Sequence, residues 1–331
     1  MQFETVESFG DMKMKPDEKA SYEKLSENSE FILSMDIGGT NTRSAFVDRG
    51  KNAFFFNTSK SEEVFGDDAV ANFVRYVEGL IKTADLSGKH IRAISAGFPS
   101  TVDQKYRKII STPNLKGLNN IEMADILEQK FGIPTLVNRD VCMLLYYDMY
   151  VHKLPKDIIV IACYIGTGIG NAIYIGGKLL SGKNGVAGEL GHIPILGGES
   201  LCGCGNRGCS ETVASGRYLS QLHNEQFSDV IIADLFAQYR QHPALQQYIR
   251  ALAIPIAIEI NIFDPHYVIL GGGVLQMKDF PKKELKSIIL EHTRKPYPEC
   301  NLEIIYTADA KTNGVIGAGI FGFEYLSEGN S

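Results

Sequence analysis

Residues 31–50 read FILSMDIGGTNTRSAFVDRG, an apolar run followed by a Gly-Gly turn and a second, alternating run. This pattern predicts a β-hairpin, because two extended segments flank residues that favour a tight turn. Residues 52–59 (NAFFFNTS) predict a third strand. The hydrophobic spacing that follows predicts a helix within 67–84, a strand at 91–100, a helix at 121–131, a strand at 134–140 and a helix at 141–151.

The same order begins again at residue 157. DIIVIACYIGTGIG (157–170) predicts an apolar strand that ends in a second glycine-rich turn, and NAIYIGGKLLSG (171–182) predicts the strand that pairs back. Helical segments run through residue 263, and the later pattern predicts a strand at 267–274, a helix near 281–292, a strand at 302–308 and a helix from about Gly314. This repetition predicts an α/β fold of two duplicated lobes that face each other across a cleft.

The length and composition place limits on the class of protein. A chain of 331 residues predicts about two domains. We expect a small lobe at 31–150, joined by a C-terminal helix at 312–331, and a large lobe at 151–311. Residues 1–30 are polar and are expected to form a mobile or loosely helical extension.

The charge and hydropathy exclude several partners. The net charge of −6 gives no basic surface for nucleic acid or for an anionic membrane. No apolar run approaches the ~20 residues that span a bilayer, and the N-terminus lacks the apolar core of a signal peptide. We therefore expect a cytoplasmic protein that binds neither nucleic acid nor membranes.

DIGGTNTR (36–43) combines a carboxylate, two glycines and several donors at the tip of the predicted hairpin. Glycines permit a close backbone approach, and successive N–H groups in such a turn can bind a polyphosphate. Asp36 could hold Mg²⁺ through water. The candidate phosphate-binding residues of this turn are Gly38, Gly39, Thr40, Asn41, Thr42 and Arg43.

Two later glycine-rich segments could complete a nucleotide site. The turn GTGIGN (166–171) offers Gly166, Thr167, Gly168 and Gly170 as a matching cradle. VILGGGV (268–274) predicts a buried strand that ends near Gly272 and Gly273, where the backbone could pass close to adenine. Ordinary tight turns are the alternative for each segment, and no segment has the Walker pattern GxxxxGK[ST]. Two such turns at equivalent places of a duplicated fold favour the phosphate-binding interpretation.

GELGHIPILGGESLCGCGNRGCSE (188–211) contains one histidine and three of the six cysteines. One imidazole and three thiolates form the ligand set of a closed, tetrahedral zinc site. A disulfide is the alternative, and a reducing compartment argues against it. We therefore predict structural zinc in this glycine-rich loop, with His192, Cys202, Cys204 and Cys209 as its ligands.

These motifs together resemble the ROK sugar kinases, which have the ribonuclease H-like (actin/hexokinase-type) ATPase fold. The resemblance covers nearly everything after residue 30. It implies ATP and Mg²⁺, transfer of the γ-phosphoryl group to the 6-hydroxyl of a hexose, and a homodimer. Within the family, IISTPNL, NRDV, GELGHIPI and INIFDPHYVILGGGV are most similar to the D-allose kinases.

The resemblance also implies roles for single residues. Asp140 matches the aspartate that accepts the proton of the sugar hydroxyl. A helix N-cap is the alternative that the residue type alone would favour, and the resemblance favours the catalytic role. Glu189, His192 and Glu211 match sugar ligands, and Asn114 is a further candidate for a hydroxyl contact. Solvated loop carboxylates and a turn-forming asparagine are the alternatives.

Arg139 is a departure from the family pattern. Glucose-type members have Glu-Asn-Asp where this chain has NRD (138–140). Arginine only donates hydrogen bonds and reaches farther than asparagine, so we expect it to distinguish the orientation of the 3-hydroxyl. A pairing of Arg139 with a neighbouring carboxylate is the alternative.

Other functions remain open at this point. A glucokinase, a fructokinase or an N-acetylmannosamine kinase would differ little in sequence, because their sugars are closely related. A sugar-sensing transcriptional repressor is less expected, since about 30 acidic and polar residues cannot supply a basic DNA-binding domain.

Overall fold

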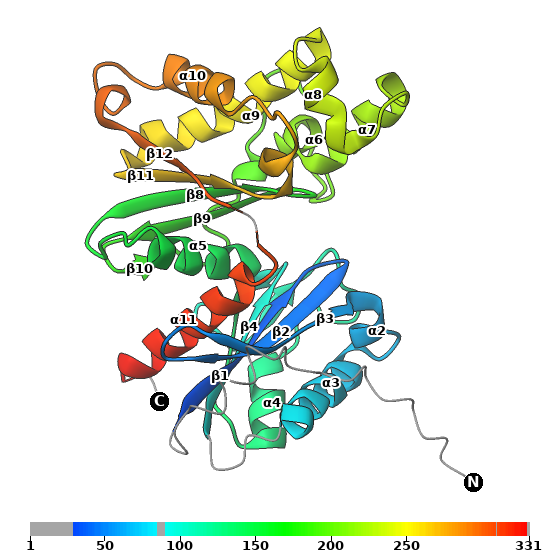
Figure 1. Ribbon diagram of the computed structural model, residues 1–331, viewed down its shortest axis with the longest axis vertical. Helices are drawn as coiled ribbons and strands as arrows, with labels where there is room; N and C mark the ends of the chain where they lie inside the picture. Colours follow the sequence, from blue (N-terminus) through cyan, green and yellow to red (C-terminus); the bar gives the residue numbers. More distant parts are fainter. Residues whose placement is uncertain (1–28, 85–89, 309, 330–331) are drawn as a thin grey trace. The chain divides into compact units, whose positions relative to one another are not determined.

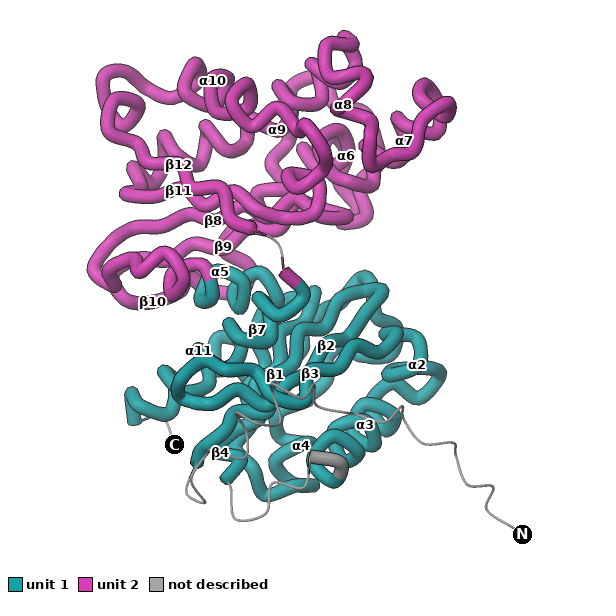
Figure 2. Tube along the Cα trace, in the orientation of Figure 1, with its two compact units in different colours: residues 1–147, 311–331 teal, residues 148–310 magenta. Residues whose placement is uncertain are grey.

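The computed structural model describes residues 29–84, 90–308 and 310–329. Most of the expected N-terminal extension, residues 1–28, lies outside the described residues. The chain divides into two compact units (Figure 2). Unit 1 comprises residues 1–147 and 311–331, and unit 2 comprises residues 148–310.

Unit 1 contains a five-stranded sheet in the order β3-β2-β1-β4-β7 (Figure 1). Its strands are β1 (Glu30–Ile37), β2 (Asn41–Asp48), β3 (Ala53–Lys60), β4 (His90–Phe98) and β7 (Thr135–Arg139). The first three strands are antiparallel neighbours, whereas β1, β4 and β7 run parallel. The predicted hairpin and third strand are therefore confirmed.

Both faces of β1 are buried, which explains its continuous apolar sequence. Phe31 and Leu33 share one hydrophobic core with Phe73, which lies on α3 (Ala69–Ala84), and with residues of α4 (Met123–Phe131). Ile32 points to the opposite face and clusters with Phe323 on α11 (Asn313–Ser327). Alternate residues of one strand thus anchor helices on the two faces of the sheet.

Three glycines of α11 let this helix lie directly on its neighbours. A Cβ at Gly317 would lie 1.8 Å from the carbonyl oxygen of Met143, on α5 (Asp140–Val151). A Cβ at Gly319 or Gly322 would lie 2.6 Å from Val47 or 2.9 Å from Ile32. The backbone of the last helix therefore packs closer to its neighbours in unit 1 than larger residues at these positions would allow.

Unit 2 repeats the same sheet, in the order β10-β9-β8-β11-β12. Its strands are β8 (Ile159–Ile165), β9 (Ile169–Ile175), β10 (Lys178–Leu179), β11 (Tyr267–Gly271) and β12 (Glu303–Tyr306). As in unit 1, a strand pairs antiparallel with the next strand and parallel with a later one. The predicted duplication of topology is confirmed.

One core of unit 2 lies between its sheet and a set of helices. Ile161 and Cys163 of β8 share this core with Leu252 and Ile256 of α9. The helices of unit 2 are α6 (Glu211–Ala214), α7 (Gly216–Gln226), α8 (Leu235–Tyr239), α9 (Pro243–Phe263) and α10 (Lys282–His292). None of the helices in the described ranges is long and apolar enough to cross a membrane.

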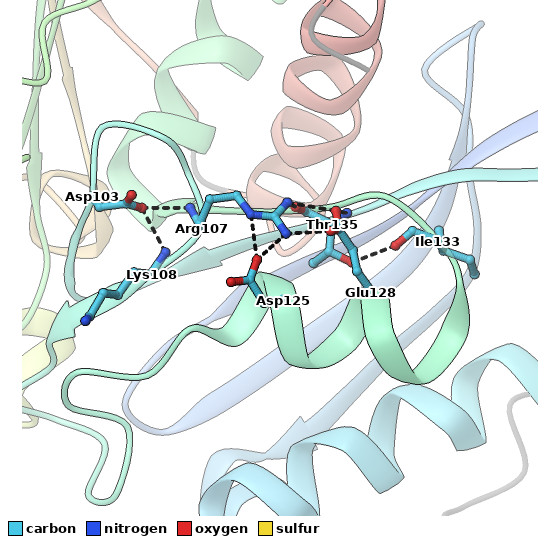
Figure 3. A network of polar contacts seen from close by, with 7 residues as sticks. All are labelled: Asp103, Arg107, Lys108, Asp125, Glu128, Ile133 and Thr135. Carbon is cyan, nitrogen blue, oxygen red and sulfur yellow. Dashed lines mark hydrogen bonds and ion pairs between the residues drawn. The ribbon is translucent and has the colours of Figure 1, made fainter.

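Short elements of unit 1 were not predicted from the sequence: α2 (Ser61–Phe65) and a hairpin of β5 (Thr101–Val102) and β6 (Ile109–Ser111). Polar contacts hold the turn of this hairpin (Figure 3). One oxygen of Asp103 accepts hydrogen bonds from the backbone N–H groups of Arg107 (2.7 Å) and Lys108 (2.8 Å). The Arg107 guanidinium then pairs with Asp125 and Glu128 of α4.

The close packing of α11 gives a stability prediction. Gly317→Ala should lower the free energy of unfolding by about 1–3 kcal/mol, because the new methyl group overlaps Met143 and forces a backbone shift. Gly79→Ala is the matched control, since Gly79 also lies in a helix and a Cβ there meets nothing within 4 Å. In the control, the free energy of unfolding should rise by about 0.5–1 kcal/mol, because alanine favours a helix more than glycine does. Urea unfolding checks both values, and equal shifts would contradict the packing argument.

Candidate functional site

The carboxyl ends of β1, β4 and β7 form one edge of the unit 1 sheet. Pairing sets Asp36 beside Gly97, and Gly97 beside Asn138. Asp140 follows directly as the first residue of α5. Ligands of α/β sheets characteristically bind outside the carboxyl ends of parallel strands. Asp36 and Asp140 thus lie at the edge where a ligand of unit 1 is expected.

Asp140 has a strongly perturbed carboxyl group. Burial by surrounding protein, and next the negative charge of Asp36, raise the pKa of Asp140 to about 7. The backbone N–H of Val141 donates to Oδ1 at 2.8 Å and, with the charge of Arg139, partly opposes this shift. Part of the residue remains accessible to solvent. Such a carboxyl can accept a proton near neutral pH, as a general base must.

Asp36 is held between an arginine and the start of the last helix. Its Oδ2 lies 3.1 Å from Nη1 of Arg43, and its side chain is 14% exposed. A Cβ at Gly314, in the first turn of α11, would lie 2.4 Å from the Asp36 carboxyl carbon. The carboxylate is therefore fixed beside the glycine turn and retains an exposed part that could hold a hydrated cation.

Ser61, which the sequence analysis missed, holds the turn between β1 and β2 by hydrogen bonds. The Ser61 hydroxyl donates to the Gly38 carbonyl at 2.6 Å, and the Ser61 N–H donates to the Thr40 carbonyl at 3.0 Å. The hydroxyl of Thr42 is buried and lies 3.0 Å from that of Ser61. Thr42 thus supports the turn from inside, whereas Gly39 and Thr40 are exposed.

Asn114 lies against the same turn. Its Cβ is 3.4 Å from the position that a Cβ of Gly39 would take. The loop that carries Asn114 is closed by Asn119, whose side-chain oxygen accepts a hydrogen bond from the Thr112 N–H at 2.8 Å. Unit 1 therefore brings a candidate sugar ligand next to the candidate phosphate turn.

Asn138 is a further polar group at this edge that the sequence analysis did not select. Its Oδ1 accepts a hydrogen bond from the Arg139 N–H at 2.8 Å. Its Nδ2 is buried and has no hydrogen-bond partner among the described residues. A buried donor without a partner is costly, so this atom is a candidate for a ligand contact beside Asp140.

The second glycine turn, in unit 2, is held by the first residues of α7. Gly166 and Thr167 accept backbone hydrogen bonds from Gly216 (2.9 Å) and Arg217 (3.0 Å). The side chain of Glu211 reaches the other side of the turn, where its Oε2 accepts a hydrogen bond from the Ile169 N–H at 3.2 Å. A candidate sugar ligand is thus joined to a candidate phosphate turn in unit 2 as well.

The remaining glycines of the predicted cradle differ in their surroundings. Gly272 has a φ of 95°, and a Cβ there would lie 2.5 Å from the backbone of Ile165. Gly273 is exposed, and a Cβ there meets nothing within 4 Å. Gly170 pairs with Tyr164 inside the β8–β9 hairpin. Gly272 therefore serves the contact with β8, whereas Gly273 leaves open space for a ligand.

The four predicted metal ligands converge in unit 2. One ligand atom from each of His192, Cys202, Cys204 and Cys209 lies within 4.8 Å of the others. Cys204 Sγ is 3.6 Å from Cys209 Sγ, and Cys202 Sγ is 3.5 Å from His192 Nδ1. Zn–S bonds of about 2.3 Å in a tetrahedron require sulfur atoms roughly 3.8 Å apart. The cluster therefore fits a zinc ion.

The two nitrogens of the His192 ring face different partners. Nδ1 faces the thiol of Cys202, whereas Nε2 lies 3.7 Å from the carboxylate of Glu189. Ser210, a residue that the sequence analysis missed, is fully buried and donates to the carbonyls of Leu190 (2.9 Å) and Gly191 (3.0 Å). Hydrogen bonds from Ser210 thus connect the cysteine loop to the GELGH segment (188–192).

Comparison with known proteins shows the family and the fold of this chain. The model of the ROK family matches residues 32–322. The chain belongs to the ROK family. A ROK family glucokinase from Streptomyces griseus, solved in complex with glucose and AMPPNP, matches with a TM-score of 0.72 and 24% identity, over 89% of this chain and 99% of that chain. The match shows that this ROK chain has the actin/hexokinase-type ATPase fold.

Relatives of this ROK chain include enzymes and regulators. A glucokinase from Thermotoga maritima is 25% identical, over 87% of this chain and 95% of that protein. A putative xylose repressor from Caldicellulosiruptor is 28% identical, over 64% of this chain and 58% of the repressor. The kinase therefore matches along nearly its whole length, and the repressor only in part.

The cluster gives a prediction about metal content. Cys204→Ser should lose the metal, because three ligands leave an incomplete site and metal binding is coupled to folding of the loop. Cys300→Ser is the matched control, since Cys300 is also exposed but lies outside the cluster. Metal analysis of protein purified without chelator should find zinc in the control and in the wild type. A wild type without zinc would contradict the assignment.

Proposed function

We propose that the chain phosphorylates the 6-hydroxyl of a hexose with ATP, and that D-allose is its main substrate. The chain is an ATP-dependent sugar kinase of the ROK family, because the kinase relative matches along almost its entire length. The observation that carries the reaction chemistry is the position of Asp140. Its carboxyl lies at the edge of the sheet that also carries the glycine turn, with a pKa of about 7.

Each group in unit 1 has a role that suits phosphoryl transfer. Asp140 accepts the proton of the attacking hydroxyl and aims its oxygen, since this reaction depends mostly on positioning and on charge neutralisation. The backbone of Gly38 and Gly39 binds phosphate oxygens. Asp36 is the residue that would hold Mg²⁺, which neutralises the charge of the phosphates when bound.

In unit 2, zinc at the cysteine cluster has a structural role. It holds a loop that is too rich in glycine to form its own apolar core. The metal bound to Nδ1 of His192 would fix the tautomer and the angle of the ring. Nε2 is then free to face the sugar together with Glu189. Glu211 binds a further hydroxyl from its place beside the Gly166–Gly168 turn.

The choice of D-allose rests on the similarity of several sequence motifs to D-allose kinases and on Arg139. Glucose, fructose and N-acetylmannosamine are the alternative substrates. A homodimer follows from the same resemblance. A sugar-sensing regulator is the alternative from another class, since a putative xylose repressor is among the relatives of this chain.

The role of Asp140 predicts a pH dependence. Because its pKa is raised, Asp140 is protonated below about pH 7, and kcat/KM for the sugar should fall as the pH drops through that value. Asp140→Asn keeps the shape but cannot accept a proton, so turnover should fall roughly 10²–10⁴-fold with little loss of binding. Steady-state kinetics across pH check both statements. A variant that kept more than half of the turnover would leave Asp140 only the role of a helix cap.

The substrate proposal is tested by release of ADP with a panel of hexoses. D-Allose should give the highest kcat/KM, and Arg139→Asn should lower it about ten- to hundredfold, because a sugar hydroxyl loses its donor. The same substitution should narrow the difference between D-allose and D-glucose. Equal shifts for both sugars would show that Arg139 does not distinguish them. No ADP release with any hexose would favour the regulator.

A further inference from the structure

The interior of unit 2 contains a carboxyl group that the proposed chemistry does not use. Glu259 lies in the last two turns of α9 and is only 4% exposed. Its Oε2 accepts a hydrogen bond from Nδ2 of Asn171 at 2.9 Å and lies 3.6 Å from the Cys163 thiol. No lysine or arginine of the described residues forms an ion pair with it. A buried carboxyl group without a cation is expensive, and neighbouring core residues of α9 are apolar.

The partner of Glu259 is an asparagine whose amide has only one suitable orientation. Nδ2 of Asn171 donates to the Ala162 carbonyl at 3.1 Å as well as to Glu259. Both neighbours are acceptors, so the NH₂ group must face them and the amide oxygen must face away. Asn171 is completely buried, and its oxygen has no hydrogen-bond partner among the described residues.

That oxygen lies against Gly188. A Cβ at Gly188 would lie 2.7 Å from Oδ1 of Asn171 and 3.2 Å from its backbone oxygen. Gly188 has a φ of 82°, a conformation that residues with a side chain rarely adopt. The next residue is Glu189, whose carboxylate lies 3.7 Å from Nε2 of His192. The amide oxygen of Asn171 thus limits how closely the backbone of Gly188 can approach β9. Gly188 directly precedes Glu189, a candidate sugar ligand.

We infer that Glu259 and Asn171 are positioning residues that set the place of Glu189 through Gly188. Glu259 fixes the orientation of the Asn171 amide, and the amide in turn fixes the height of Gly188 above β9. Without the acceptor on α9, the Ala162 carbonyl alone holds the NH₂ group, so the amide is less firmly fixed and Gly188 can shift. This inference rests on the proposed sugar kinase activity, because Glu189 is taken as a ligand of the sugar.

A purely structural role for the buried pair predicts a different result. Removing one partner of a buried hydrogen bond leaves the other partner unsatisfied and changes stability. If Glu259 served stability alone, Glu259→Leu would change the melting temperature and leave sugar binding intact. If Glu259 positions Glu189, the same variant binds sugar less well even when it is as stable as the wild type.

The test measures KM for the hexose and for ATP, together with melting temperature and zinc content. Asn171→Ala and Glu259→Leu should each raise KM for the hexose roughly ten- to hundredfold, as expected for a displaced ligand. KM for ATP should change by less than about twofold, since the phosphate turns are not displaced. Zinc content should stay at the wild-type value, which separates this effect from loss of the metal.

Two further variants complete the design. Glu259→Gln keeps an acceptor for Asn171 and should retain most of the affinity for the hexose. Tyr248→Phe is the matched control, because Tyr248 is also buried on α9 and its hydroxyl has no partner among the described residues. It should leave both KM values unchanged.

The outcomes separate the inference from the proposed function. An unchanged hexose KM in Asn171→Ala and Glu259→Leu, with an active wild type, overturns the positioning role alone. Equal losses for hexose and ATP would also overturn it, because they indicate general damage to unit 2. A wild type that phosphorylates no hexose overturns the proposed function and, with it, this inference.

Discussion

The close contact between backbone and carboxylates at one sheet edge is the constraint on which unit 1 depends. A Cβ at Gly314 would lie 2.4 Å from the Asp36 carboxyl carbon, and a Cβ at Gly97 would lie 3.1 Å from Cα of Asp140. Larger residues at either place would push the two carboxylates apart or move them outward. The start of α11 must therefore stay against β1, which explains why the end of the chain belongs to the same unit as its first strands.

In unit 2, a glycine also allows close backbone packing at the end of a strand, but the loop with the candidate sugar ligands is held differently. Gly272 touches the end of β8 at Ile165, as glycines do in unit 1. The segment that carries Glu189 and Glu211, by contrast, has few apolar side chains that could form a core. A cluster of one histidine and three cysteines provides fixed geometry there instead. In the proposed function, the candidate metal ligands and the buried amide would position the candidate sugar ligands on a loop that hydrophobic packing alone would leave unspecified.

Most of the fold and of the candidate site could be predicted because their signals are local. Apolar runs next to glycine turns identified both hairpins, and the cysteine spacing identified the cluster. The β5–β6 hairpin was missed because its strands are only two and three residues long and depend on Asp103 for their turn. Glu259 and Asn171 could not be paired from sequence, because 88 residues separate them and α9 has an apolar sequence. Thr42 was selected for its residue type, whereas only the structure shows that its hydroxyl is buried.

The two carboxylates at the edge of unit 1 also connect reactivity with stability. The raised pKa of Asp140 means that the folded protein takes up a proton that the unfolded chain releases at its ordinary value of 3.8. The free energy of unfolding therefore decreases as the pH rises from 3.8 to about 7. Above pH 7 this contribution of Asp140 stays at its lowest value. Burial and, next, the negative charge of Asp36 cause this loss of stability, and the positive charge of Arg139 offsets part of it. A ligand that brings positive charge to this edge would lower the pKa of Asp140 and would stabilise unit 1 by the same interaction. The raised pKa of Asp140 and its cost in stability thus have one physical cause, which is a common trade between activity and stability.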